Sequence, residues 1–151
     1  MYIGNIFEVT EELQESVQRL IPQLGAHKMP PTLEELDTLI KSESSTLVVA
    51  RDPDEDGAIA GILSLIIYRV PTGLRSIIED VVVDEKMRRR GIGKALVRYA
   101  IELARKAGAD GVSLTSNSER EAANHLYQSI GFQIRKTNPY YYELTARLTH
   151  C

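Results

Sequence analysis

Cysteine is almost absent from this chain of 151 residues, and tryptophan is missing altogether. The one cysteine, Cys151, cannot form an intrachain disulfide, which suits a reducing compartment, and its place at the chain end argues against a nucleophile. The longest apolar run, 58–68, is too short to cross a bilayer. No basic segment followed by an apolar one opens the chain, so we expect no signal peptide, a cytoplasmic location and no membrane partner.

A basic excess is also missing, because 18 Lys and Arg stand against 21 Asp and Glu, for a net charge of -3. Such a chain cannot neutralise a long phosphate backbone, so we expect no nucleic-acid partner. The arginines at 88–90 form a local basic patch, which fits a small anionic ligand better. The length is typical of one domain with a sizeable core, and we expect a single domain over residues 1–151.

Hydrophobic periodicity predicts an α/β (α+β) fold with a mixed, mostly antiparallel central sheet. The expected strands are 3–9, 46–50, 58–69, 75–83, 111–115, 132–135 and 140–144. The expected helices follow Thr10, Thr32, Gly93 and Ser118, and Thr32 with Glu35 and Ser118 with Glu121 form capping-box patterns. This order gives about seven strands flanked by about four helices, with strands 75–83 and 111–115 parallel.

One stretch joins a strand to a helix through a basic turn that contains glycine. It runs from Arg88 to Lys94 and follows Val81-Val82-Val83, an apolar run without alternation that suggests burial on both faces. Glycine lets the backbone approach a ligand closely, and the free N–H groups at a helix start favour phosphate. The turn fails the Walker pattern because Ala95 follows Lys94. A dinucleotide-binding module remains an alternative, although Leu96 stands where its third glycine belongs.

Two separated segments carry a resemblance to a known family. Arg88 to Gly93 satisfies R/Q-x-x-G-x-G/A, the coenzyme A pyrophosphate turn between a strand and a helix. Ala123 to Phe132 matches A-x-x-L-Y-x-x-x-G-F. In this order and at this separation, the two segments resemble the GNAT superfamily of acyl-CoA-dependent N-acyltransferases. The expected order of helices and strands extends the resemblance over nearly the whole chain.

The resemblance implies a site for acetyl-CoA, with coenzyme A as the co-substrate and no metal. The backbone of Val81, Val82 and Val83 is expected to pair with the pantetheine arm as if it were an extra strand, beside a parallel strand that splays away. The pyrophosphate is expected on Arg88, Arg89, Arg90, Gly91, Ile92, Gly93 and Lys94. Arg120 occupies the position of an asparagine that many members share, so Arg120, Asn117 or Asn124 is expected to contact the cofactor instead.

The chemistry of amide formation indicates which side chains to seek. An alkylamine has a pKa near ~10.4 and must lose a proton before it attacks a thioester. The family often places its base on the strand before the turn, which favours Glu79 here, while the position that some members use holds Ile77. Strict alternation would put Glu79 on the face of Val81 and Val83, opposite Asp80.

Tyr127 is expected to reprotonate the thiolate that leaves, because a phenol with a pKa near ~10 can protonate that base. With no cysteine except Cys151, we expect direct attack in a ternary complex rather than a covalent acyl-enzyme. The expected function is N-acetyl transfer to a primary amine, and the alternative is a non-catalytic acyl-CoA-binding or sensing domain.

The resemblance places the acceptor amine among the first two helices, their loop and the last strands. Acidic side chains there faintly favour a cationic amine, although acidic helix starts also follow from the dipole. They are Glu11, Glu12, Glu15, Glu34, Glu35 and Asp37. Tyr140, Tyr141 and Tyr142 are expected to divide between core and surface or to mark the face of a homodimer.

Overall fold

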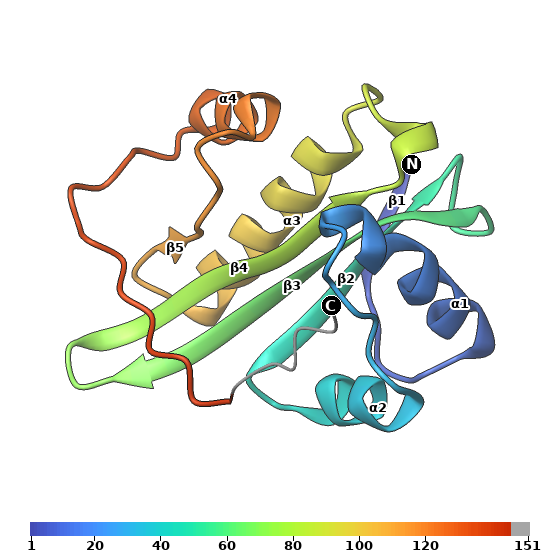
Figure 1. Cartoon of the computed structure of the whole chain (residues 1–151), viewed down its shortest axis with the longest axis horizontal. Coiled ribbons are helices and arrows are strands. Elements are labelled where there is room, and N and C mark those ends of the chain that lie inside the picture. The colour runs from blue at the N-terminus through green and yellow to red at the C-terminus, as the bar shows by residue number, and fades with distance from the viewer. Residues whose placement is uncertain (146–151) are drawn as a thin grey trace.

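A five-stranded sheet with the strand order β1-β2-β3-β4-β5 forms the centre of the computed structural model, which describes residues 1–145 (Figure 1). The strands are β1 (Tyr2–Asn5), β2 (Ser45–Asp52), β3 (Ala58–Val70), β4 (Gly73–Val83) and β5 (Val112–Ser113). β1 to β4 pair antiparallel with their neighbours, and β5 pairs parallel with β4. The expected mixed and mostly antiparallel sheet is therefore confirmed.

The helices begin and end at residues that the local chemistry favours. They are α1 (Glu11–Leu20), the 3-10 turn η1 (Ile21–Leu24), α2 (Leu33–Lys41), the 3-10 turn η2 (Glu85–Met87), α3 (Ile92–Ala107) and α4 (Glu121–Ile130). The hydroxyl of Thr10 accepts from the N–H of Leu13, and Thr32 forms the expected capping box with Glu35. No helix within the described residues is long and apolar enough to cross a membrane.

Two hydrophobic cores lie on opposite faces of the sheet, with α3 on one face and α1 and α2 on the other (Figure 1). Leu96 and Val97 of α3 pack with Leu63 and Leu65 of β3 in the first core. The second core contains Leu13, Val17, Leu20, Leu36, Val49 and Ile62. Because β3 contributes to both cores, it fixes the helices on either face relative to β4.

Two predicted strands do not form, so the sheet has five strands rather than about seven. Residues 132–135 and 140–144 are in no strand of the described chain. Their large apolar side chains, Ile134, Tyr140, Tyr141, Tyr142 and Leu144, are 84–91% exposed. The edge strand β5, which precedes them in the chain, is only two residues long and therefore offers few backbone groups to pair with.

The capping box expected at Ser118 and Glu121 is also wrong. The N-cap of α4 is Arg120, which makes no side-chain cap hydrogen bond. Asn117 instead organises the preceding turn, because its Oδ1 accepts from the N–H of Glu119 at 2.9 Å. Asparagine commonly hydrogen-bonds its own backbone two residues ahead, and here that preference moved the helix start.

Candidate functional site

A β-bulge interrupts β4 just before its last residues. Ser64 pairs with Glu79 and Ile62 pairs with Val82, so β4 has one more residue than β3 between these two pairs. Asp80 has a φ of 49°, in the left-handed region that side-chain-bearing residues rarely adopt. The extra residue reverses the alternation of side chains along the rest of the strand.

The bulge corrects the predicted orientation of Glu79. Val81 and Val83 pack against the core under α3, whereas Val82 belongs to the core under α1 and α2. Ile78 also lies in the α3 core, so its neighbour Glu79 points to the opposite face, the face of Val82. Glu79 therefore shares a face with α1 and α2 and not with Val81 and Val83.

The parallel strand leaves β4 early. β5 pairs with β4 only at Ser76 with Val112 and at Ile77 with Ser113. The hydroxyl of Ser76 donates to the carbonyl of Gly111 at 2.7 Å and fastens the two strands there. No strand of the described chain pairs with β4 on this side beyond Ile77, so the edge from Glu79 to Val83 is open.

Hydrogen bonds show which backbone groups reach that open edge. The N–H of Asp84 donates to the carbonyl of Ala60 on β3 at 2.8 Å, so the N–H of the preceding residue, Val83, points the other way. The carbonyl of Val83 accepts from Nε of Arg88 at 3.3 Å, which also directs it away from β3. The open edge thus presents peptide groups in the geometry of a strand that lacks a neighbour.

The first turn of α3 presents free N–H groups next to this edge. Gly91 is the N-cap with a φ of 78° and no side-chain cap, and the first helical bond runs from the N–H of Ala95 to the Gly91 carbonyl. The N–H groups of Ile92, Gly93 and Lys94 precede that bond and lie at the positive end of the helix dipole. An anion is favoured at such a position.

The three arginines of the turn have different surroundings. Arg88 binds the carbonyl of Val83, and Arg90 forms an ion pair with Asp52 at 3.1 Å. Arg89 is exposed and has a φ of 66°, a left-handed conformation that costs a residue with a side chain about 1–2 kcal/mol. The patch predicted at 88–90 thus contains one arginine that fastens the turn to the β2–β3 hairpin.

Tyr127 comes from α4 and is 8% exposed. Burial raises the pKa of its phenol above the ordinary value, and the nearby charge of Arg120 partly opposes that rise. Its ring packs edge-on against Phe132, with centroids 6.0 Å apart. A phenol with a raised pKa stays protonated and can act as an acid over the whole neutral range.

Gly93 marks where the three elements meet. A Cβ placed on Gly93 would lie 3.6 Å from a methyl group of Leu126 and 3.6 Å from a methyl group of Val83. Leu126 is the neighbour of Tyr127 in α4, and Val83 ends β4. The structure therefore brings the open strand edge, the start of α3 and the tyrosine helix to one place.

Two further side chains that were predicted to contact the cofactor, Arg120 and Asn124, lie at the start of α4. The side chain of Asn124 donates to the carbonyl of Asn117 at 2.9 Å, so it braces the turn before the helix. Arg120 lies close enough to Tyr127 to influence its pKa. Of these side chains, Arg120 is the one whose charge acts directly on the candidate acid.

The arrangement can bind an extended amide-bearing chain at the open edge and an anion at the α3 start. Within residues 1–145, no group of three His, Cys, Asp or Glu residues is placed to hold a metal ion. Sequence reasoning missed Asp80, whose conformation creates the bulge, although two adjacent acidic residues inside an apolar strand were a usable signal. It also missed Asp84, which is 8% exposed at the end of β4.

Similarity to known proteins bears directly on this site. The model of the acetyltransferase (GNAT) family matches residues 8–132. N-acetyltransferase family 8 member 3 of Rattus norvegicus is 34% identical over 113 residues, which are 74% of this chain and 47% of that protein. The uncharacterized N-acetyltransferase YhdJ of Bacillus subtilis is 33% identical over 103 residues, 68% of this chain and 71% of that protein. The chain spans about half the length of the rat relative.

Solved structures agree with the fold. An acetyltransferase of Trypanosoma brucei superposes with a TM-score of 0.73 at 24% identity, covering 94% of this chain and 99% of that one. An aminoglycoside acetyltransferase from an uncultured soil metagenomic sample, in complex with sisomicin, has a TM-score of 0.80 at 19% identity and covers 95% of this chain and 96% of that one. These likenesses concern the fold alone. Together with the family match, they allow one conclusion: the chain belongs to the acetyltransferase (GNAT) family.

Proposed function

We propose that this protein transfers an acetyl group from acetyl-CoA to a primary amine by direct attack in a ternary complex. The observation that carries the proposal is the convergence at Gly93, where the end of β4, the start of α3 and the helix of Tyr127 meet. Family membership supports acyl transfer, and this convergence supports the place where it occurs.

The residues present fit coenzyme A. Its pantetheine arm contains amide groups that can pair with an open strand edge, as a peptide does in β-augmentation. The edge from Glu79 to Val83 offers such groups over the stretch that β5 leaves uncovered. Its pyrophosphate suits the N–H groups of Ile92, Gly93 and Lys94, next to the exposed side chain of Arg89.

Each step of the transfer has a candidate group. The thioester supplies the acetyl group, and a free N–H between Val81 and Val83 stabilises the carbonyl oxygen as charge develops there. Glu79 takes the proton of the attacking amine, directly or through a water molecule. Its side chain is exposed and lies on the face of the sheet that carries α1 and α2, the helices expected to border the acceptor. Tyr127 donates its proton to the sulfur as the carbon–sulfur bond breaks.

Several acidic side chains expected to favour a cationic acceptor are engaged elsewhere. Glu12 pairs with Arg51, Glu35 caps Thr32, and Asp37 pairs with Lys41. Glu11, Glu15 and Glu34 remain on the surface of α1 and α2. The acceptor screen should therefore weigh cationic and neutral amines equally, with aminoglycosides included because a protein of the same fold acts on that class.

A turnover screen tests the proposal. Acetyl-CoA is mixed with polyamines, amino acids, aminoglycosides and peptides, and the release of free thiol is followed for each. Coenzyme A binding is measured separately by calorimetry. We expect coenzyme A to bind and at least one amine class to be acetylated. Binding without turnover on any amine would favour the acyl-CoA-sensing alternative, and preferential binding of NAD would favour a dinucleotide-binding module.

A further inference from the structure

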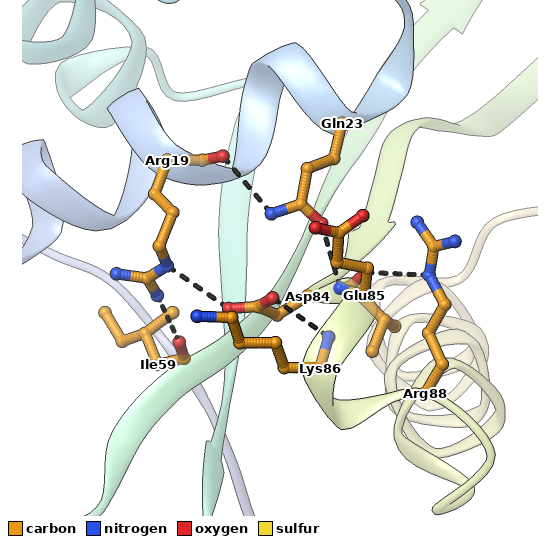
Figure 2. Close-up of polar contacts among 8 residues, drawn as sticks. Arg19, Gln23, Ile59, Asp84, Glu85, Lys86 and Arg88 are labelled. Carbon is orange, nitrogen blue, oxygen red and sulfur yellow. Dashed lines mark hydrogen bonds and ion pairs between the residues drawn. The ribbon is translucent and has the colours of Figure 1, made fainter.

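A polar cluster ties α1 and η1 to the end of β4 (Figure 2). Nε of Arg19 donates to Oδ2 of Asp84 at 3.2 Å, and Nη2 of the same side chain donates to the carbonyl of Ile59 on β3 at 2.8 Å. One guanidinium therefore bridges the last turn of α1 to β3 and to the residue that follows β4. The planar fork of arginine suits this double role, which a lysine could fill only in part.

Gln23 makes a second bridge beside the first (Figure 2). Its Nε2 donates to the carbonyl of Arg19 at 3.3 Å, and its Oε1 accepts from the N–H of Glu85 at 2.9 Å. The amide group is thus used at both ends. It connects η1 to the first residue of η2, in the segment that leads into the turn at 88–94.

Asp84 stands at the centre of the cluster. Its Oδ1 accepts from the N–H of Lys86 at 3.2 Å, and its Oδ2 binds Arg19. Burial alone would raise the pKa of this carboxyl, but the Lys86 N–H and the guanidinium of Arg19 outweigh that effect and hold its pKa below the ordinary value. Asp84 therefore remains charged, and both carboxylate oxygens hold parts of the chain in place.

This ion pair joins separate elements, as Arg51–Glu12 and Arg90–Asp52 also do. The pairs Lys41–Asp37 and Arg105–Glu102 are exposed and link residues on the same helix, so they contribute little to tertiary structure. Arg19 and Asp84 are 65 positions apart in sequence; the Arg19 side chain is 46% exposed and the carboxylate side chain is 12% exposed. Such a pair fixes one element relative to another.

The two sides of the cluster lead to two parts of the proposed site. η2 runs directly into the turn at 88–94, where we place the pyrophosphate. η1 runs directly into residues 25–32, the loop before α2. This loop belongs to the region expected to border the acceptor, so the cluster lies where the two binding regions adjoin.

We propose that Arg19 and Gln23 are positioning residues that hold the coenzyme turn ready for its ligand and link the occupancy of that turn to the order of the loop at 25–32. The proposal rests on the proposed coenzyme A site but assigns new residues to it. Ordering a loose turn on binding costs free energy, so a turn fixed in advance binds more tightly. By the same linkage, ligand bound at the turn should steady the segment attached to it.

The test replaces Arg19 by Met, which keeps the length and apolar stem of the side chain but removes its hydrogen bonds. We expect the Kd for coenzyme A, measured by calorimetry, to rise roughly five- to tenfold. Arg19→Lys should recover part of the loss, because it keeps the charge near Asp84 without the full fork. Gln23→Met tests the second bridge in a half-buried position and should weaken binding in the same direction.

Arg51→Met is the matched control. Arg51, in β2, also binds a carboxylate, that of Glu12, and a backbone carbonyl, that of Gly57. Its contact with Glu12 is at the start of α1, whereas Arg19 lies in the last turn. We expect a loss of stability without a change in the Kd for coenzyme A. If Arg19 had a purely structural role, Arg19→Met would also lower stability without changing the Kd for coenzyme A. Comparing the two variants therefore distinguishes a positioning role from a role in stability alone.

Hydrogen exchange supplies a readout that needs no acceptor. On addition of coenzyme A, the amides of residues 21–32 should exchange more slowly in the wild type and at an unchanged rate in Arg19→Met and Gln23→Met. Equal Kd values for the wild type and both variants, with equal protection of the loop, would overturn the inference and leave the coenzyme site standing. Failure of the wild type to bind coenzyme A at all would instead overturn the proposed function.

Discussion

Tyr127 follows Leu126, whose side chain lies beside Gly93, and burial raises the pKa of its phenol. If it protonates the leaving thiolate, Tyr127→Phe should lower kcat by about 10²- to 10⁴-fold, the usual range for a general acid. The Kd for coenzyme A should stay within about twofold of the wild type, because the ring remains. Thiol-release kinetics and calorimetry on the same samples measure the two quantities.

Tyr99 provides the control for that experiment. Burial raises the pKa of its phenol too, but the hydroxyl donates to the side chain of Asn5 at 2.9 Å and lies on α3 away from Gly93. Tyr99→Phe should cost stability and leave kcat unchanged. A wild-type rate in Tyr127→Phe would show that another group, or water, delivers the proton.

Arg89 holds a strained backbone conformation at a φ of 66°. Arg89→Gly removes that strain, whereas Arg89→Ala removes only the side chain. The glycine variant should therefore be about 1 kcal/mol more stable than the alanine variant. Urea unfolding of both variants measures the difference, and the wild type serves as the reference. Equal midpoints would mean that the turn adopts another conformation in solution.

At the level of elements, Gly61 lies where β3 packs closely against α3 and β4. A Cβ on Gly61 would lie 3.1 Å from both a methyl group of Leu96 and the carbonyl of Val82. Gly61→Ala should lower the free energy of unfolding by about 1–3 kcal/mol, because neither the helix nor the strand can yield easily.

Gly93→Ala is the corresponding control at the next contact of the same helix. Its Cβ would meet ordinary contact distances of 3.6 Å, and alanine favours a helix over glycine by about 1 kcal/mol. We therefore expect little loss of stability, as measured by the same unfolding experiment. A greater loss in Gly93→Ala than in Gly61→Ala would contradict the packing described here.

Sequence patterns predicted most elements because local chemistry determined them. Thr10 and Thr32 cap their helices as expected, and Gly108 ends α3 with a φ of 84°. The lengths of the strands were harder to predict, because they depend on pairing with other strands. The strand expected over 111–115 is only Val112–Ser113, and the strand expected over 3–9 ends at Asn5. The strands expected at 132–135 and 140–144 had suitable composition but no partner along β5.

The sequence motifs of the proposed site are local, whereas the orientation of Glu79 depends on the pairing of two strands. The turn at 88–94 and Tyr127 were visible as motifs, and Leu126, the neighbour of Tyr127, lies beside Gly93 of that turn. The side of the sheet on which Glu79 lies could not be read from alternation, because the bulge at Asp80 depends on how β4 meets β3. The bridges of Arg19 and Gln23 join segments far apart in sequence and left no local pattern.

For the whole molecule, Asp84 should make stability depend on pH. Its pKa lies below the ordinary carboxyl value in the folded chain, so its contribution is complete above the unfolded pKa of about 3.9 and is lost as the pH falls through the folded value. Asp84→Asn should be less stable than the wild type at pH 7, and the two proteins should converge as the pH falls below about 4.

Urea midpoints from pH 7 to pH 3 measure this convergence. Asp56→Asn is a suitable comparison, because Asp56 is exposed in the β2–β3 turn and the hydrogen bond found there uses its backbone N–H. It should follow the wild-type profile. A constant difference between Asp84→Asn and the wild type at every pH would show that the carboxylate charge does not stabilise the fold.

The early departure of β5 from β4 has a consequence for handling the protein. Unpaired peptide groups along a strand edge are a template for joining another chain, which is how many β-proteins aggregate. Here the bulge at Asp80 and the exposed charges of Glu79 and Asp80 interrupt that edge. They provide the protection that natural edge strands usually carry, along the stretch where we propose that the pantetheine arm binds.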